Sequence, residues 1–137
     1  GSNRLAPSII ASCLNGKKVA TTLGEQVRDF VNVKDVARAI ISLSESQYKK
    51  YEVYNICSSN PVTVKSFIDE IVNVCGFDKS LIEFGALPYR ENEAMMFAGN
   101  NEKLQNVVHY PFPDNHREGI LDIYNALKLT INEVGER

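Results

Sequence analysis

The spacing of apolar residues switches repeatedly between a helical and an extended period along this chain, and that alternation limits its fold most. Helical spacing marks residues 7–14, 35–44, 64–75 and 102–107, and a long stretch after Pro113 that carries Ile120 to Val134. Strand-like runs mark residues 19–23, 27–33, 53–56 and 81–84, whereas residues 85–97 show no clear period and are expected to form an ordered loop. The pattern predicts an α/β chain, a mixed α+β small domain over residues 4–137.

Several residues mark the expected helix ends. Thr63 is a typical N-cap for the third helix, and Gly76 is a typical C-cap. We expect Asp35 to cap the helix that it begins and to have no catalytic role. The apolar stripe Val36, Ile40 and Leu43 is expected to face the core.

Composition excludes several classes of function. A net charge of −2, from 15 basic and 17 acidic residues, does not favour a protein that binds nucleic acid through its phosphates. No apolar run approaches the roughly 18–20 residues that span a membrane, so we expect no membrane partner. Residues 1–3 resemble a remnant of an expression tag.

Cysteine and histidine spacing argues against a metal site or a disulfide framework. Cys13, Cys57 and Cys75 are far apart and lie in apolar contexts, which favours free thiols and a cytoplasmic location. His109 and His116 have no cysteine nearby, so we predict that no metal is bound.

The sequence contains no motif for a self-contained active site. It has no G-x-G-x-x-G turn for a dinucleotide pyrophosphate, no phosphate-binding G-x-x-x-x-G-K-[ST] loop, no G-x-S-x-G elbow and no H-E-x-x-H pair. We therefore assign no catalytic and no cofactor-binding residue.

The most distinctive segment is residues 24–37, which reads as a turn, a strand and the start of a helix. Arg28 projects from the strand beside Asp29. A surface ion pair is one interpretation, and such a pair contributes less than about 1 kcal/mol. Binding of an anionic ligand is the other, because a guanidinium group is a planar fork that stays protonated and can meet two anionic oxygens.

The order of residues 24–37 resembles the R-D-F-V-x-V-x-D-V-A signature of the extended short-chain dehydrogenase/reductase family, the nucleotide-sugar epimerases and dehydratases. Four further segments resemble that family's motifs in the same order, and the five matches together span nearly the whole chain. They are Tyr54-Asn55-Ile56 with Ser58 and the helix opened by Val62-Thr63-Val64, the R-x-x-E loop of Arg90 and Glu93, Asn100 with Lys103 and Leu104, and Glu118-Gly119-Ile120.

This resemblance implies the C-terminal part of such an enzyme, with a cleft for a nucleoside-diphosphate sugar. In the family, the arginines at the positions of Arg28 and Arg90 hold the substrate's pyrophosphate. The strand that contains Val19 and Thr21 would lie along the nucleobase, with backbone groups reading its edge. For Val19 and Thr21, simple packing remains the alternative.

The resemblance also implies that NAD(P) and the catalytic Y-x-x-x-K pair belong to an N-terminal Rossmann half. The parent enzyme would be an oxidoreductase, isomerase or lyase acting at sugar C4, and this chain alone would be inactive and bind no cofactor. Tyr124 and Lys128 match Y-x-x-x-K, but they lie in the last predicted helix, downstream of the R-D-F strand and not upstream of it. Asn100 departs from the family, which usually has an aspartate there.

A non-enzymatic module, which keeps the substrate-domain fold to bind a ligand or a partner, is the alternative function. A natural start near Asn3 would favour it, whereas an upstream glycine-rich turn with Y-x-x-x-K would favour the enzyme. If residues 53–56 form a strand that normally extends a cofactor-domain sheet, its unpaired edge would favour self-association.

Overall fold

The computed structural model describes residues 4–47 and 51–135, with side chains as far as Ile131. Residues 1–3, which we interpreted as a tag remnant, lie outside this range. In chain order the elements are α1 (Leu5–Leu14), β1 (Val19–Ala20), β2 (Val27–Arg28), α2 (Val33–Glu45), β3 (Val62–Thr63), α3 (Val64–Cys75), the 3-10 turn η1 (Lys79–Leu81), β4 (Ile82–Glu83), β5 (Met96–Phe97), α4 (Glu102–Val108) and α5 (Arg117–Gly135).

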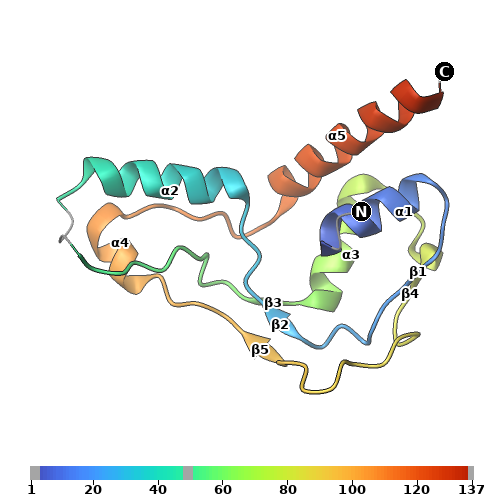
Figure 1. Ribbon diagram of the computed structural model, residues 1–137, viewed down its shortest axis with the longest axis horizontal. Coiled ribbons are helices and arrows are strands. Elements are labelled where there is room, and N and C mark those ends of the chain that lie inside the picture. Colours follow the sequence, from blue (N-terminus) through green and yellow to red (C-terminus); the bar gives the residue numbers. More distant parts are fainter. Residues whose placement is uncertain (1–3, 48–50, 136–137) are drawn as a thin grey trace.

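The elements form two groups with a small sheet between them (Figure 1). In one group, α1 and α3 lie beside the parallel pair of β1 and β4, and α5 packs against both helices. In the other group, α2 lies against α4. The sheet between them has the strand order β3-β2-β5, with β2 antiparallel to β3 and parallel to β5. The predicted mixed α/β class is confirmed.

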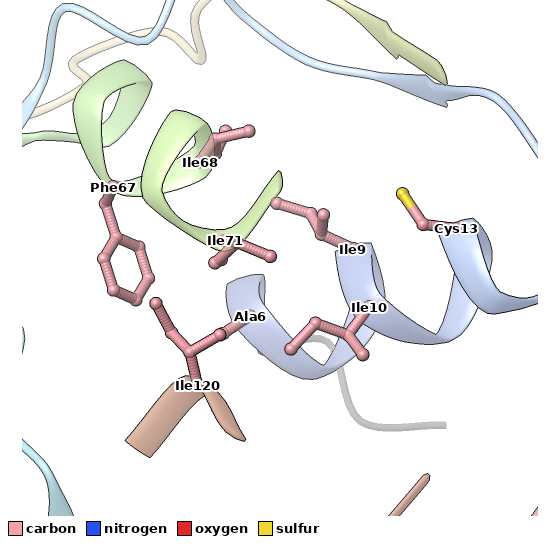
Figure 2. Close-up of a cluster of buried hydrophobic side chains, with 8 residues drawn as sticks. All are labelled: Ala6, Ile9, Ile10, Cys13, Phe67, Ile68, Ile71 and Ile120. Atoms are coloured by element: carbon pink, nitrogen blue, oxygen red, sulfur yellow. The ribbon is translucent and has the colours of Figure 1, made fainter. Parts of the chain in front are cut away.

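The core lies where α1, α3 and α5 meet. Figure 2 shows Ile9 and Ile10 from α1, Ile68 and Ile71 from α3, and Ile120 from α5 in one buried cluster. All five are at most 1% exposed. Burying each of these side chains contributes about 1.5–3 kcal/mol. The two helices predicted over residues 7–14 and 64–75 thus supply most of this core.

Both predicted caps of α3 are confirmed. The Oγ1 atom of Thr63 accepts a hydrogen bond from the Ser66 N–H at 3.1 Å. Gly76 ends the helix with a φ of 67°, in the left-handed region that a side chain disfavours.

The cap of α2 differs from the prediction. Asn32, not Asp35, is the N-cap, and its Oδ1 accepts a hydrogen bond from the Lys34 N–H at 3.0 Å. The chain becomes helical at Val33, so Asp35 falls inside the first turn, where its side chain is buried.

The predicted apolar stripe of α2 does not face a core. Ile40 is 51% exposed, and Val36 and Leu43 are only half-buried. The side that α2 buries instead carries Asp35 and Ala39, because the polar groups around Asp35 bond to the segment after α4. Periodicity identified the helix correctly but not the side that it buries.

The strands are shorter than their sequence patterns. Of the run 19–23 only Val19–Ala20 pairs, with β4, and of the run 27–33 only Val27–Arg28 pairs. Residues 53–56, predicted as a strand, form none, and the Val53 carbonyl instead accepts a hydrogen bond from Lys103 Nζ at 2.8 Å. A strand requires a backbone alongside it, which the sequence pattern does not reveal. The expectation that this segment offers an unpaired edge to a neighbouring strand stays a prediction.

Within residues 4–47 and 51–135, no helix is both long and apolar enough to cross a membrane.

Gly24 and Gly16 offer a matched test of backbone crowding. Both have a positive φ, of 76° and 64°. A Cβ at Gly24 would lie 2.9 Å from the backbone nitrogen of Lys65, whereas one at Gly16 would have no neighbour within 4 Å. We predict that Gly16→Ala lowers the free energy of unfolding by about 1 kcal/mol, from backbone strain alone. Gly24→Ala should lower it clearly more, as measured by urea unfolding, and equal losses would contradict the prediction.

Candidate functional site

The four residues predicted to bind a substrate, Val19, Thr21, Arg28 and Arg90, line one cavity of about 610 Å³. They come from β1, from the segment after it, from β2 and from the loop before β5. The cavity also has an apolar side, which is lined by Leu5, Ile9, Phe30, Val64 and Ile68. The structure thus brings together two arginines and a set of apolar side chains, of which Leu5 and Arg90 are 85 positions apart in the sequence.

Arg28 is held firmly at the wall of this cavity. Its Nη2 donates to Glu93 Oε1 at 2.9 Å and to the Ala94 carbonyl at 2.7 Å, and its Nη1 donates to the Val27 carbonyl at 2.8 Å. The side chains of Arg28 and Glu93 are 24% and 22% exposed. This ion pair therefore lies largely out of solvent, unlike the exposed pair with Asp29 that the sequence suggested as one interpretation.

The parallel pairing of β2 with β5 explains how Glu93 reaches Arg28. Arg28 pairs with Phe97, which places the residues just before β5 beside the start of β2. Glu93 belongs to the R-x-x-E loop, but the sequence did not show that it contacts Arg28. Arg90 lies one turn earlier, since its carbonyl accepts a hydrogen bond from the Glu93 N–H at 3.1 Å. Arg90 is exposed at the same cavity.

The backbone of Thr21 is occupied by protein partners. Its N–H donates to the Glu83 carbonyl at 3.0 Å, and its carbonyl accepts from the Leu87 N–H at 3.0 Å. The side-chain hydroxyl donates to the Thr22 carbonyl at 2.9 Å. Both backbone groups of Thr21 are thus bonded within the protein, because β4 runs alongside, and the expectation that this strand lies along a nucleobase stays a prediction. Val19 contributes its side chain to both the cavity wall and the core.

Gln26 and Thr22 are cavity residues that the sequence analysis missed. Gln26 is only 7% exposed, and its side-chain oxygen and nitrogen lie 3.3 and 3.2 Å from the Thr22 hydroxyl. The available signal was positional: Gln26 lies two residues before Arg28, so an extended backbone puts both side chains on the same side.

Asp29 joins the cavity to the loop that follows residues 53–56. Its Oδ1 accepts hydrogen bonds from the Ser58 hydroxyl at 2.5 Å and from the Ser58 N–H at 3.2 Å. Its Oδ2 accepts from the Ser59 N–H at 2.9 Å. Asp29 therefore fixes the loop at Ser58 and Ser59, and it does not serve as the ion-pair partner of Arg28.

A second cavity, of about 820 Å³, lies between the starts of α1, α2 and α5. The rings of Phe30 and Phe67 stack there with centroids 3.8 Å apart, and the ring of His116 meets both edge-on. Glu70 accepts from the His116 N–H at 2.8 Å and contacts its Nδ1 at 2.7 Å. Because these side chains contact one another, we assign them a structural role.

Asp35 is also engaged in structure. Its Oδ1 accepts a hydrogen bond from the Tyr110 hydroxyl at 2.7 Å and contacts Arg38 Nη1 at 3.3 Å. Burial, together with the hydrogen bond to Asp35, raises the pKa of the Tyr110 hydroxyl above its ordinary value. This contact ties α2 to the segment after α4.

Cysteines and histidines are dispersed. Across the described parts of the chain, no three His, Cys, Asp or Glu side chains form a group that could hold a metal ion. Cys13 and Cys57 are buried and Cys75 is half-buried. Burial raises the pKa of the Cys13 thiol, and burial together with the neighbouring Cys13 raises the pKa of Cys75 to about 11.

Tyr124 and Lys128, the pair that matches Y-x-x-x-K, lie outside both cavities. The Tyr124 ring meets Phe77 edge-on with centroids 5.9 Å apart, and the Lys128 Nζ lies 5.6 Å from the Tyr124 centroid. This tyrosine packs beside the core, so its position gives no support to a catalytic role.

Asn100 stands just before α4. Its Oδ1 accepts a hydrogen bond from the Glu102 N–H at 2.7 Å, and its carbonyl lies 3.4 Å from Asn55 Nδ2. An amide oxygen accepts the bond from Glu102 as a carboxylate would. An asparagine therefore suffices for this contact with the start of α4.

Comparison with known proteins places these features in a family. Residues 1–57 match the model of the NAD dependent epimerase/dehydratase family. CDP-abequose synthase of Salmonella typhimurium is 34% identical over 132 residues, which are 93% of this chain and 44% of that protein. The chain is thus similar to this family, and the relative matches it over nearly its whole length. The resemblance found in the motifs is thereby confirmed.

Solved structures of the epimerase/dehydratase type share the fold. UDP-glucose 4-epimerase of Thermotoga maritima, in complex with UDP-glucose, is similar over 96% of this chain and 41% of its own, with a TM-score of 0.80 and 24% identity. dTDP-glucose 4,6-dehydratase of Bacillus anthracis, in complex with NAD, is similar over 89% of this chain and 38% of its own, with a TM-score of 0.73 and 26% identity. The chain spans less than half the length of each of these proteins.

The sequence has no G-x-G-x-x-G turn, and among the described residues neither of the two cavities is bordered by a glycine-rich turn between a strand and a helix.

We predict that Asp29→Ala lowers the free energy of unfolding by about 1.5–3 kcal/mol, because it removes charged hydrogen bonds to the loop at Ser58. Chemical denaturation followed by circular dichroism measures the change. Asp114→Ala, at an exposed position, is the matched control and should change stability by less than about 0.5 kcal/mol. A loss no larger than that of the control would show that the Asp29 contacts contribute little.

Proposed function

We propose that this chain is the substrate-binding part of an NAD(P)-dependent nucleotide-sugar epimerase, dehydratase or reductase that acts at sugar C4. The substrate is a nucleoside-diphosphate sugar. The observation that carries the proposal is the cavity of about 610 Å³, which combines two arginines with an apolar wall. The match of residues 1–57 to the NAD dependent epimerase/dehydratase family supports the reaction type.

Arg28 and Arg90 bind the pyrophosphate in this proposal. Both line the cavity, and the carboxylate oxygen of Glu93 already lies 2.9 Å from Arg28 Nη2. The guanidinium group is thus oriented by protein contacts before a ligand arrives. Charge-assisted hydrogen bonds of this kind contribute about 1.5–3 kcal/mol each.

The nucleobase lies in the part of the cavity lined by Val19 and Thr21. Apolar neighbours such as Ile9 and Phe30 offer a surface on which a base can be buried. Because the Thr21 N–H bonds to Glu83, the polar contacts to the base come from other groups of this wall.

Catalysis and cofactor binding belong, in this proposal, to residues outside this chain. Neither cavity of this chain contains Tyr124 or Lys128, the sequence's match to Y-x-x-x-K. The chain alone binds the nucleotide sugar without turning it over. It is expected to bind neither NAD nor NADP.

Exposed apolar side chains mark the surface that would contact a cofactor-binding partner domain. On α2, Val33 is 77%, Ile40 51% and Ile41 56% exposed, and Val53, whose carbonyl bonds to Lys103 of α4, is 80% exposed. Large side chains of this kind on one helix favour contact with a partner.

The proposal predicts that Arg28→Ala weakens binding of a nucleoside diphosphate by roughly ten- to a hundredfold, because it removes charge-assisted hydrogen bonds. Isothermal titration calorimetry of the chain with UDP-, dTDP-, CDP- and GDP-sugars measures the affinities. Arg117→Ala, at an exposed arginine at the start of α5, is the matched control and should leave them unchanged.

Unchanged affinity in Arg28→Ala would refute the assignment of the pyrophosphate to Arg28. If the unaltered chain binds none of these nucleotides, the proposed function itself is wrong for this chain.

A further inference from the structure

Gln26 is a buried polar side chain whose hydrogen-bonding capacity exceeds its protein contacts. Its side-chain bonds in the structure are both to the Thr22 hydroxyl, which lies 3.2 Å from Nε2 and 3.3 Å from Oε1. A primary amide offers two N–H donors and a carbonyl oxygen with two lone pairs, so one N–H and one lone pair remain beyond the two contacts with Thr22. Since Gln26 also lines the cavity, the unmet capacity is available to a bound molecule.

The position of Gln26 relative to Arg28 suits the nucleoside part of the ligand. The two residues are two apart, both line the cavity, and Val27 between them does not. In an extended chain this places their backbones about 6.6 Å apart. In a nucleotide, one ribose separates the base from the α-phosphate. If Arg28 binds the phosphate, a residue that contacts the base must therefore lie close to Arg28.

Thr22 makes the amide adaptable. Its hydroxyl oxygen accepts a hydrogen bond from the Gly24 N–H at 3.2 Å, which fixes the oxygen in place. The Thr22 hydroxyl can donate its proton to Gln26 Oε1, and its remaining lone pair can accept a hydrogen bond from Gln26 Nε2. Either end of the amide can therefore turn toward the cavity, so Gln26 can meet a donor or an acceptor on the ligand.

We propose that Gln26, oriented by Thr22, hydrogen-bonds the edge of the nucleobase and sets which base is accepted. The inference rests on the proposed function, because it needs the pyrophosphate at Arg28. Uracil presents a carbonyl oxygen at the position where cytosine presents an amino group. An amide that can turn either end toward the cavity can donate to the carbonyl oxygen of uracil or accept from the amino group of cytosine. A carboxylate at the same position can only accept, and so pairs only with the amino group.

The test is calorimetry of the whole chain with UDP, CDP and inorganic pyrophosphate. Gln26→Met keeps the length of the side chain but removes both polar atoms, and should weaken UDP and CDP about fivefold to tenfold. Inorganic pyrophosphate has no base, so its affinity should not change. Gln26→Glu should shift the ratio of the two affinities toward CDP by about tenfold. Gln47→Met, at an exposed position after α2, is the matched control.

Two outcomes overturn the inference and leave the proposed function intact. One is that both Gln26 variants bind UDP and CDP with the affinities of the unaltered chain. The other is that Gln26→Met weakens pyrophosphate as much as UDP, which identifies a structural role. If Gln26→Met fails to fold, as judged by circular dichroism, the affinity ratio in Gln26→Glu decides. If the unaltered chain binds none of the three probes, the proposed function fails and this inference fails with it.

Discussion

The packing of α1 against α3 supports both the core and the cavity. Ile9 and Ile68 are at most 1% exposed, belong to the buried cluster and also line the cavity wall. A side chain that closes the core on one side thus forms the apolar surface of the site on the other. Any change that loosens these two helices alters the shape of the cavity as well as the stability of the chain, because interiors are close-packed.

A second constraint positions the charged wall. The parallel pair of β2 and β5 is only two residues long, yet it sets Glu93 and the Ala94 carbonyl against Arg28. A fixed guanidinium group loses little freedom when an anion binds, which favours affinity. Asp29, the next residue, faces the loop at Ser58 and bonds there, so two adjacent charges serve different parts of the fold.

The helices were predictable from sequence because their signals are local. The apolar spacing of α1 and α3 and the capping residues Thr63 and Gly76 act within a few residues, and the structure shows the helices and caps that they indicate. The lengths of the strands were not, because pairing depends on a distant backbone: β1, β2 and β4 lie within predicted runs but are only two residues long. The prediction of which side α2 buries was wrong for a related reason, because Asp35 bonds to Tyr110, seventy-five positions away. The order of the motifs predicted that Arg28 and Arg90 lie at one site, and both line the same cavity. The hydrogen bonds that distinguish Gln26 and Glu93 could not be predicted, because they depend on the folded structure.

The loop of residues 85–93 has a consequence for how the chain folds. It is held against residues 21–28 by Leu87 at Thr21, by Tyr89 at Glu25 and by Glu93 at Arg28, and the side-chain pairs among these are 64 and 65 positions apart. Closing so long a stretch of chain costs entropy that local helices do not pay. Contacts of this range form slowly compared with helices, so the two sides of the cavity meet late in folding. A chain with formed helices but an open loop would look helical and yet bind nothing, and recovery of ligand binding would lag behind recovery of helical signal.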